Sequence, residues 1–264
     1  MAEEHKFLDL DDDKPKKKSK KAKVAKTNKA THYLLILDRS GSMSSVADST
    51  VSGFNENVET LKALKKDFPE QTYTVSLLMF NSNIEEVHWL SDVDKLEKLT
   101  VEKYNPSGST YLFNTVGYAV NRIKKELESK MLKDKEIKIV VSIFTDGEDT
   151  CYGQGDYKAE DVGKLNEELQ KTGQWTFTYA GANHDVYAVT QKMSIPMSNT
   201  MSYNSSVAGT QSAFQTQTES LTSYATSRSL NKDVSAGFYD VDPKDAVNVD
   251  PAVEYIDPDA KDTK

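Results

Sequence analysis

The chain has 264 residues, 37% of them hydrophobic, and its 33 basic and 41 acidic residues give a net charge of −8. This length allows one large domain or two small ones. No run of about 18 apolar residues occurs, so we expect no membrane-spanning helix. The acidic start lacks the apolar stretch of a secretory signal. The single cysteine, Cys151, favours a reducing, cytoplasmic compartment.

The two ends of the chain differ from the middle in charge. Residues 1–30 hold six acids and ten lysines, nine of the lysines between Lys14 and Lys29, whereas residues 231–264 hold nine acids and four lysines. Neither end shows helical or strand periodicity, so we predict disordered tails on either side of one domain at residues 31–230. The lysine run is either a solvated tether or a weak contact for nucleic acid or another polyanion.

The middle of the chain alternates between short apolar runs and segments with helical spacing. We predict a strand at residues 32–37, a helix at 46–68, strands at 73–80 and 84–90, a short helix or turn at 92–99, a helix at 111–133, a strand at 137–144, a helix at 159–172, a strand at 175–180 and a helix at 185–193. The tight turn Asn81-Ser82-Asn83 suggests that the strands on either side of it pair antiparallel.

The last predicted element is a helix in the Ser, Thr and Gln-rich residues 198–230, where Val207, Phe214 and Leu221 recur every seven residues. This spacing predicts an amphipathic helix that closes the domain rather than a surface for a partner helix. The whole alternation predicts a doubly wound, mostly parallel α/β sheet with one antiparallel edge strand and helices on both faces.

Three oxygen-rich loops lie at predicted junctions of strands and helices. The loop residues that could ligate a cation are Asp38, Ser40, Ser42, Thr110 and Asp146. Any one loop alone favours an ordinary helix cap or turn. All three in order favour a hard cation, because Mg²⁺ prefers oxygen ligands in octahedral geometry. Mn²⁺ and Ca²⁺ are the alternatives.

The Asp-Arg-Ser-Gly-Ser sequence at residues 38–42 resembles the DxSxS signature of von Willebrand factor A (vWA) domains. The resemblance implies a metal-ion-dependent adhesion site (MIDAS), usually holding Mg²⁺. Asp38, Ser40 and Ser42 would form its first motif, Thr110 its second and Asp146 its third. In the family the hydroxyls typically ligate directly and the aspartates directly or through water. A partner's carboxylate can fill an open position.

The resemblance covers about residues 31–195. The chain looks most like small stand-alone intracellular vWA proteins of bacteria and bacteriophages. Segments resembling GANHDVYAV and AGTQSAF also recur in that subgroup, and they extend the resemblance to about residue 230. Two positions depart from the family pattern. Gly108-Ser109 replaces a common glycine pair, and Asn114 stands where an aspartate is frequent. Neither departure removes a predicted ligand.

The leading hypothesis is therefore a non-enzymatic, Mg²⁺-dependent adaptor that binds a protein partner presenting Asp or Glu. The first alternative is a structural or assembly protein, for example of a bacteriophage, whose vWA fold is a scaffold and whose tails make the contacts in a host cytoplasm or virion. The second is a metal-dependent hydrolase. The sequence disfavours it because no nucleophile elbow, HExxH motif or phosphate loop occurs.

Overall fold

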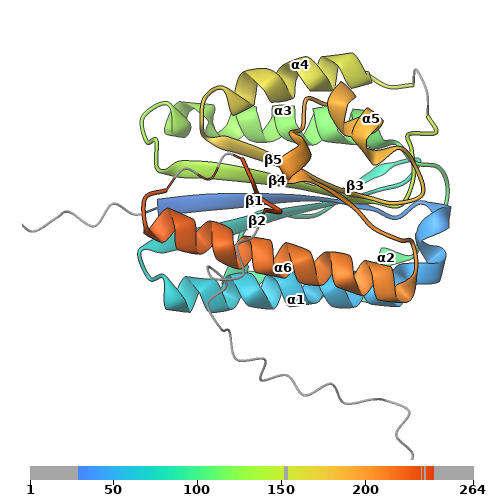
Figure 1. Cartoon of the computed structure of the whole chain (residues 1–264), viewed down its shortest axis with the longest axis horizontal. Helices are drawn as coiled ribbons and strands as arrows, with labels where there is room; N and C mark the ends of the chain where they lie inside the picture. The colour runs from blue at the N-terminus through green and yellow to red at the C-terminus, as the bar shows by residue number, and fades with distance from the viewer. Residues whose placement is uncertain (1–28, 152–153, 233, 235, 241–264) are drawn as a thin grey trace, which may run out of the picture.

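A sheet lies between two layers of helices in the computed structural model, which describes residues 29–151, 154–232, 234 and 236–240 (Figure 1). The strands are β1 Lys29–Asp38, β2 Gln71–Phe80, β3 Ile84–Asp92, β4 Ile137–Thr145, β5 Trp175–Gly181 and β6 Thr200–Ser202. The α-helices are α1 Ala47–Asp67, α2 Val101–Tyr104, α3 Leu112–Met131, α4 Ala159–Gln170, α5 Val186–Lys192 and α6 Val207–Ser229. Short 3₁₀ helices occupy Gly41–Val46, Val93–Lys95 and Met197–Asn199.

The sheet has the strand order β3-β2-β1-β4-β5-β6. All neighbouring strands run parallel except β2 and β3, which pair antiparallel at one edge. The predicted fold class is therefore confirmed. β1 and β4 are neighbours in the middle of the sheet, with Leu37 opposite Phe144. The loops that follow these two strands consequently emerge side by side, at the edge where ligands bind in open α/β sheets.

Alternate residues of the central strand supply two separate cores. Leu35 and Leu37 face the layer that contains α1 and α6, whereas Leu34 and Ile36 face the layer that contains α3, α4 and α5 (Figure 1). A strand covered by helices on both faces is apolar on both faces. This burial explains why residues 32–37 form a continuous apolar run instead of an alternating one.

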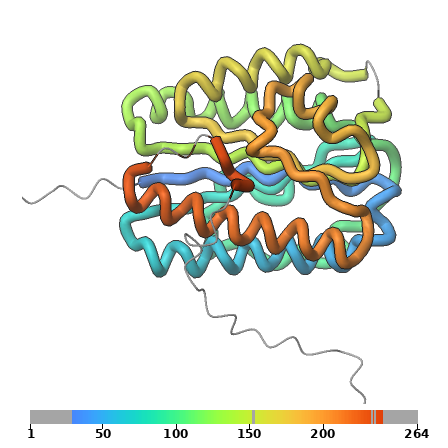
Figure 2. The backbone as a smooth tube through the Cα atoms, in the orientation of Figure 1, coloured from blue at the N-terminus to red at the C-terminus, as the bar shows by residue number. Residues whose placement is uncertain are grey.

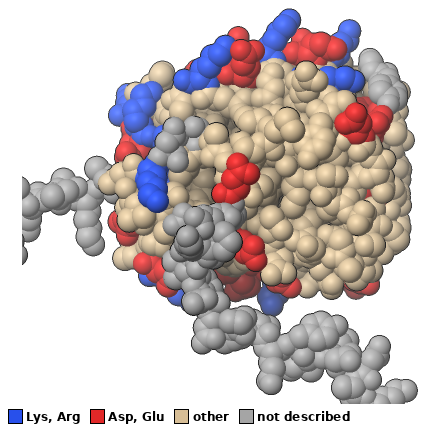
Figure 3. Space-filling view, viewed as in Figure 1, with Lys and Arg blue, Asp and Glu red and all other residues tan. Residues whose placement is uncertain are grey.

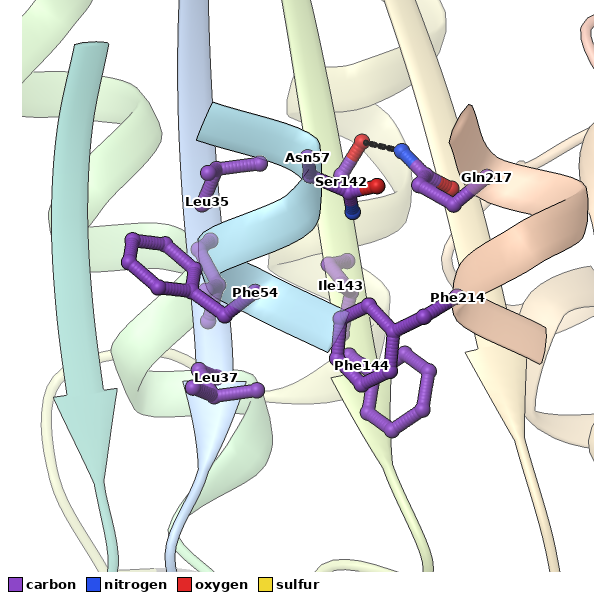
Figure 4. A pocket seen from close by; sticks show the side chains of 10 residues that line it. Leu35, Leu37, Phe54, Asn57, Ser142, Ile143, Phe144, Phe214 and Gln217 are labelled. Carbon is purple, nitrogen blue, oxygen red and sulfur yellow. Dashed lines mark hydrogen bonds between the residues drawn. The ribbon is translucent and has the colours of Figure 1, made fainter. Parts of the chain in front are cut away.

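α6 lies beside α1, although the two helices are far apart in the sequence (Figure 2). Phe214 stacks on Phe144 of β4, with 4.3 Å between ring centroids. Gln217 Nε2 donates to Ser142 Oγ at 2.9 Å beneath the helix (Figure 4). The predicted closing helix is thus confirmed, but its buried stripe is partly polar. Val207, at its first turn, is 54% exposed.

The folded region extends beyond the predicted bounds of residues 31–230. β1 already begins at Lys29, and Val234 and Phe238 pack into the core beneath α6. Residues 1–28 and 241–264 lie outside the described residues. They include most of both predicted tails and every lysine of the Lys14–Lys29 run except Lys29. None of the described helices is both long and apolar enough to cross a lipid bilayer.

Candidate metal centre

The first predicted loop begins where β1 ends. The buried carboxylate of Asp38 accepts hydrogen bonds from the backbone N of Ser40 (2.7 Å to Oδ1) and from Thr145 Oγ1 (2.5 Å to Oδ2). The chain then enters the 3₁₀ helix Gly41–Val46, and this places the hydroxyls of Ser40 and Ser42 3.1 Å apart. Ser40 is buried, whereas Ser42 is exposed.

The second loop is held against the first by main-chain contacts. Gly41 N donates to the carbonyl of Gly108 at 3.0 Å. Gly108 has a φ of +76°, in the left-handed region that favours glycine, and a Cβ there would lie 2.8 Å from Ser82 Oγ. Thr110 follows and is buried, with its backbone N donating to Thr150 Oγ1 at 2.9 Å. The predicted second ligand is therefore fixed between the other two loops.

The third loop follows β4 and completes the cluster. Ser42 Oγ donates to Oδ1 of the buried Asp146 at 2.6 Å. A Cβ on Gly147 would lie 3.8 Å from Thr110 Oγ1 and 4.0 Å from Ser42 Oγ, so both hydroxyls flank this loop. The structure brings together all of the predicted site residues, namely Asp38, Ser40, Ser42, Thr110 and Asp146.

The oxygen atoms of this cluster fit a small hard cation. Neighbouring ligands of an octahedral Mg²⁺ ion lie about 2.9 Å apart, because each Mg–O distance is about 2.0–2.1 Å. The spacings of Ser42 Oγ to Ser40 Oγ (3.1 Å) and to Asp146 Oδ1 (2.6 Å) bracket that value. Within the described residues, no three His, Cys, Asp or Glu side chains gather to hold a metal. The candidate set is instead made of two carboxylates and three hydroxyls.

The electrostatics of the cluster favour a bound cation. Burial raises the pKa of Asp38 to about 6, although the hydrogen bonds from Thr145 and Ser40 act in the opposite direction. In the described part of the chain, no ion pair joins Asp38 or Asp146 to a basic side chain, and Arg39 pairs with Glu85 instead. Burying two ionised carboxylates without a basic partner lowers the stability of the folded protein, and a divalent cation between them would offset that loss.

Three residues that hold this cluster were not predicted. Thr145 binds the second oxygen of Asp38, the Tyr104 hydroxyl donates to the carbonyl of Asp38, and Ser205 Oγ donates to Asp146 Oδ2 at 3.2 Å. Thr145 directly precedes Asp146, so its position in the sequence was a usable signal. Tyr104 and Ser205 come from α2 and from the segment before α6, and only the fold brings them to the site.

Residues beside the cluster have structural roles. Asp149 is buried, and its carboxylate accepts from the backbone N of Phe113 (2.9 Å) and of Cys151 (2.8 Å). It therefore binds the first turn of α3 from another loop, consistent with the preference of helix N-termini for carboxylates. Asn114, at the position where the family often has aspartate, accepts from the backbone N of Asp156 at 2.9 Å and holds that loop in place.

Comparison with known proteins gives the following matches. A family model described as von Willebrand factor type A domain matches residues 34–237. No curated protein matches the chain in sequence. A solved vWA structure from Catenulispora acidiphila is similar at 15% identity and a TM-score of 0.52, covering 72% of this chain and 42% of that one.

Two further similar structures have lower TM-scores. Manganese-loaded TRAP protein of Plasmodium vivax has 14% identity and a TM-score of 0.46, covering 71% of this chain and 72% of that one. Proximal thread matrix protein 1 of the mussel byssus, with a zinc-occupied MIDAS motif, has 15% identity and a TM-score of 0.41. The match covers 73% of this chain and 45% of that one. The chain spans less than half of the Catenulispora and mussel chains. It belongs to the von Willebrand factor type A domain family, whose members are generally metal-dependent adhesion or protein-interaction modules.

Proposed function

We propose that this chain is a non-enzymatic, intracellular protein-binding module that uses Mg²⁺ to capture an Asp or Glu side chain of a partner. Asp38, Ser40, Ser42, Thr110 and Asp146 would hold the cation. The observation that carries the proposal is the difference in exposure within this set. Four of the residues are buried, whereas Ser42 is exposed at the opening of the cluster, where a partner can approach.

The composition of the ligand set explains why an acidic partner would be preferred. Three of the five oxygen donors are neutral hydroxyls, so they compensate little of the cation's charge. A bound divalent cation would supply Lewis acidity toward a further anionic oxygen. Neutral side chains of a partner would compete poorly with water for that position.

The surroundings of His184 support a binding role over catalysis. His184 comes shortly after the end of β5, at the same edge of the sheet as the loops that follow β1 and β4, so it would be the natural general base. Its ring nitrogens are 2.9 Å from the Tyr179 hydroxyl and 2.5 Å from the carbonyl of Ala182. Both nitrogens therefore have partners within the protein, and neither is available to activate a water at the metal.

A capture experiment tests this proposal. Immobilised wild type, Ser42→Ala and Ser45→Ala proteins are incubated with lysate of the cells that produce the protein, in Mg²⁺ and in EDTA. Ser45 is exposed on the same 3₁₀ helix as Ser42, so Ser45→Ala is the matched control. We expect a partner to bind wild type and Ser45→Ala in Mg²⁺ only. Replacing one Asp or Glu of that partner with Asn or Gln should abolish capture.

Two results would contradict the proposal. One is equal capture in all samples, which would make the predicted metal ligands irrelevant to binding. The other is a Mg²⁺-dependent partner for which no single acidic residue matters. Catalytic turnover that is lost in Asp38→Ala would argue against the non-enzymatic part and for the hydrolase alternative.

A further inference from the structure

The opposite end of the molecule contains a basic cavity that the proposed metal-dependent function does not use. It has a volume of about 480 Å³ and lies where β4 begins and α6 ends. Its lining includes Lys135, Lys138, Arg228 and Lys232, with Glu136 as the one carboxylate among the described lining residues. Figure 3 shows basic side chains, with acidic ones among them, at this left-hand end of the molecule, whereas the right-hand part of the same face is mostly uncharged.

The positive charge at the base of this cavity is fixed in the fold. The Arg228 side chain is 3% exposed, and its guanidinium donates to the carbonyl of Ala30 (3.0 Å), to Thr31 Oγ1 (2.6 Å) and to the carbonyl of Glu136 (2.6 Å). All three acceptors are neutral, and the Glu136 carboxylate is 3.8 Å away. That carboxylate forms an ion pair with Arg228 and offsets part of its charge, but the three closer partners are neutral and little solvent screens the guanidinium, so part of its field remains in the cavity.

The lysines around the rim add to this field. Lys135 Nζ donates to Gln174 Oε1 at 3.0 Å, and Lys138 Nζ donates to the carbonyl of Gly173 at 2.6 Å. Lys232 is exposed after the end of α6. Among the described lining residues, four basic groups thus face one carboxylate, and this balance favours a ligand with several negative charges.

An apolar hollow adjoins the basic cavity and shares Lys135 with it. Its lining includes Met131, Leu132, Leu169 and Trp175, and Leu132 is 69% exposed. A small inorganic anion would fill only the basic part of this combined surface. A peptide in which acidic and apolar side chains alternate would match both parts.

We propose that the acidic C-terminal segment of this chain, residues 241–264, docks in cis on the basic cavity and its apolar hollow. This segment holds seven acids and three lysines, and it contains the sequence Val253-Glu-Tyr-Ile-Asp257, in which acidic and apolar residues are interspersed. Its carboxylates would lie against the lysines, and its Tyr255 and Ile256 side chains would cover the hollow beside Leu132.

The path of the chain makes this contact accessible. Val234 lines the basic cavity, and the described chain ends six residues later at Asp240. The 24 residues that follow can extend over about 80 Å. Docking in cis needs only weak affinity, because a tethered segment has an effective concentration of order 1 mM.

Paramagnetic NMR on the full chain tests the proposal. A nitroxide label is attached at Ala252→Cys in a Cys151→Ser background, and amide intensities are compared with those of the reduced label. We expect the amides of Gly173 and Gln174 to lose at least about half of their intensity, because paramagnetic broadening falls with the sixth power of distance and even a partly populated docked state dominates it. The amides of Ser42 and Gly147, at the metal centre, should be unaffected.

Charge and salt provide the controls. The intensity loss should disappear in the triple variant Lys135→Gln, Lys138→Gln, Lys232→Gln. It should also disappear in 1 M NaCl, where the Debye length is about 3 Å. The matched variant replaces three exposed lysines elsewhere with Gln and changes the net charge equally. These lysines are Lys66, Lys98 and Lys164.

Three outcomes would overturn the proposal. Intensity loss at Gly147 instead of Gly173 would place the segment on the metal centre. Loss at neither end would show that the segment does not dock. Loss that survives when ¹⁵N-labelled and spin-labelled chains are different molecules would assign the contact to a second copy. None of these outcomes depends on Mg²⁺, so failure here is distinguishable from failure of the proposed function.

Discussion

At the scale of single residues, Thr145 decides how the Asp38 carboxylate is oriented. Thr145 Oγ1 donates to Oδ2 of Asp38, and the Ser40 backbone N donates to Oδ1. Both carboxylate oxygens are thus fixed before any cation binds. Groups that orient a metal ligand in this way contribute to metal affinity without touching the metal.

Replacing Thr145 with Val should weaken Mg²⁺ binding by roughly 10–100-fold, because Val keeps the shape of Thr but cannot donate to Asp38. Thr145→Ser retains the hydroxyl and should bind close to wild type. Isothermal titration calorimetry measures both. If Thr145→Val and wild type had the same Kd, the orienting role assigned to this hydroxyl would be wrong.

At the scale of secondary structure elements, the close approach of α1 and α6 is made possible by Gly53. A Cβ on Gly53 would lie 2.2–2.5 Å from atoms of the Phe214 side chain, which stacks on Phe144 of the sheet. Phe214 therefore cannot move toward β4 to make room. The position of α6 matters for the site, because the segment that precedes it carries Ser205 to Asp146.

Gly53→Ala should lower the free energy of unfolding by about 1–3 kcal/mol, the usual cost of inserting a methyl group into a packed interface. Helix propensity alone would predict a small gain in stability, so the sign of the change is informative. Ser52→Ala, on the exposed face of the same helix, is the control. Urea denaturation gives both values, and a stabilised Gly53→Ala would contradict the packing described for α1 and α6.

The elements that could be predicted from the sequence are those with strong periodicity. β1, β4 and α3 followed from apolar runs and helical spacing, and the alternation of strands and helices predicted the parallel sheet. α2 and β6 were missed, because four and three residues are too few to show a period. The packing of residues after α6 was not predicted either. The short stretch around Phe238 has no periodicity, and it is held in the core by packing against Tyr224 of α6 and by a hydrogen bond from its backbone N to Asn199.

The candidate site was predictable to the extent that its residues follow strands. Asp38 and Asp146 come directly after β1 and β4, so the fold class alone places them side by side. Tyr104 and Ser205 could not be predicted, because their contacts join segments that are far apart in the sequence. The partly polar stripe of α6 was likewise not evident, since Gln217 finds its partner Ser142 only in the folded sheet.

At the scale of the whole molecule, acid stability depends on the buried His32 in the central strand. Its Nδ1 lies 2.9 Å from Thr74 Oγ1, and burial lowers its pKa from 6.5 to about 3. The unfolded chain therefore takes up this proton first as the pH falls. Stability is lost from about pH 6.5 downward, until the folded protein is itself protonated near pH 3.

When the pH is lowered from neutral to about 5, the unfolding free energy of wild type should fall by about 2 kcal/mol more than that of His32→Gln. Burial shifts the pKa of Asp38 in the opposite sense, but Asp38 is present in both proteins, so its contribution cancels. Urea denaturation in EDTA at the two pH values measures the difference. Identical pH dependence in the two proteins would show that His32 is not buried in its neutral form.

The most direct test of the account is a calorimetric titration of Mg²⁺ into wild type, Ser42→Ala and Ser45→Ala proteins. We predict one site in wild type and Ser45→Ala, and a Kd raised by roughly 10-fold or more in Ser42→Ala, because a ligand is lost. Ser42 is exposed, so its replacement should leave the fold intact, and urea denaturation of the three proteins checks this. Equal Mg²⁺ affinity in all three proteins, or no binding in any, would contradict the assignment of the metal centre.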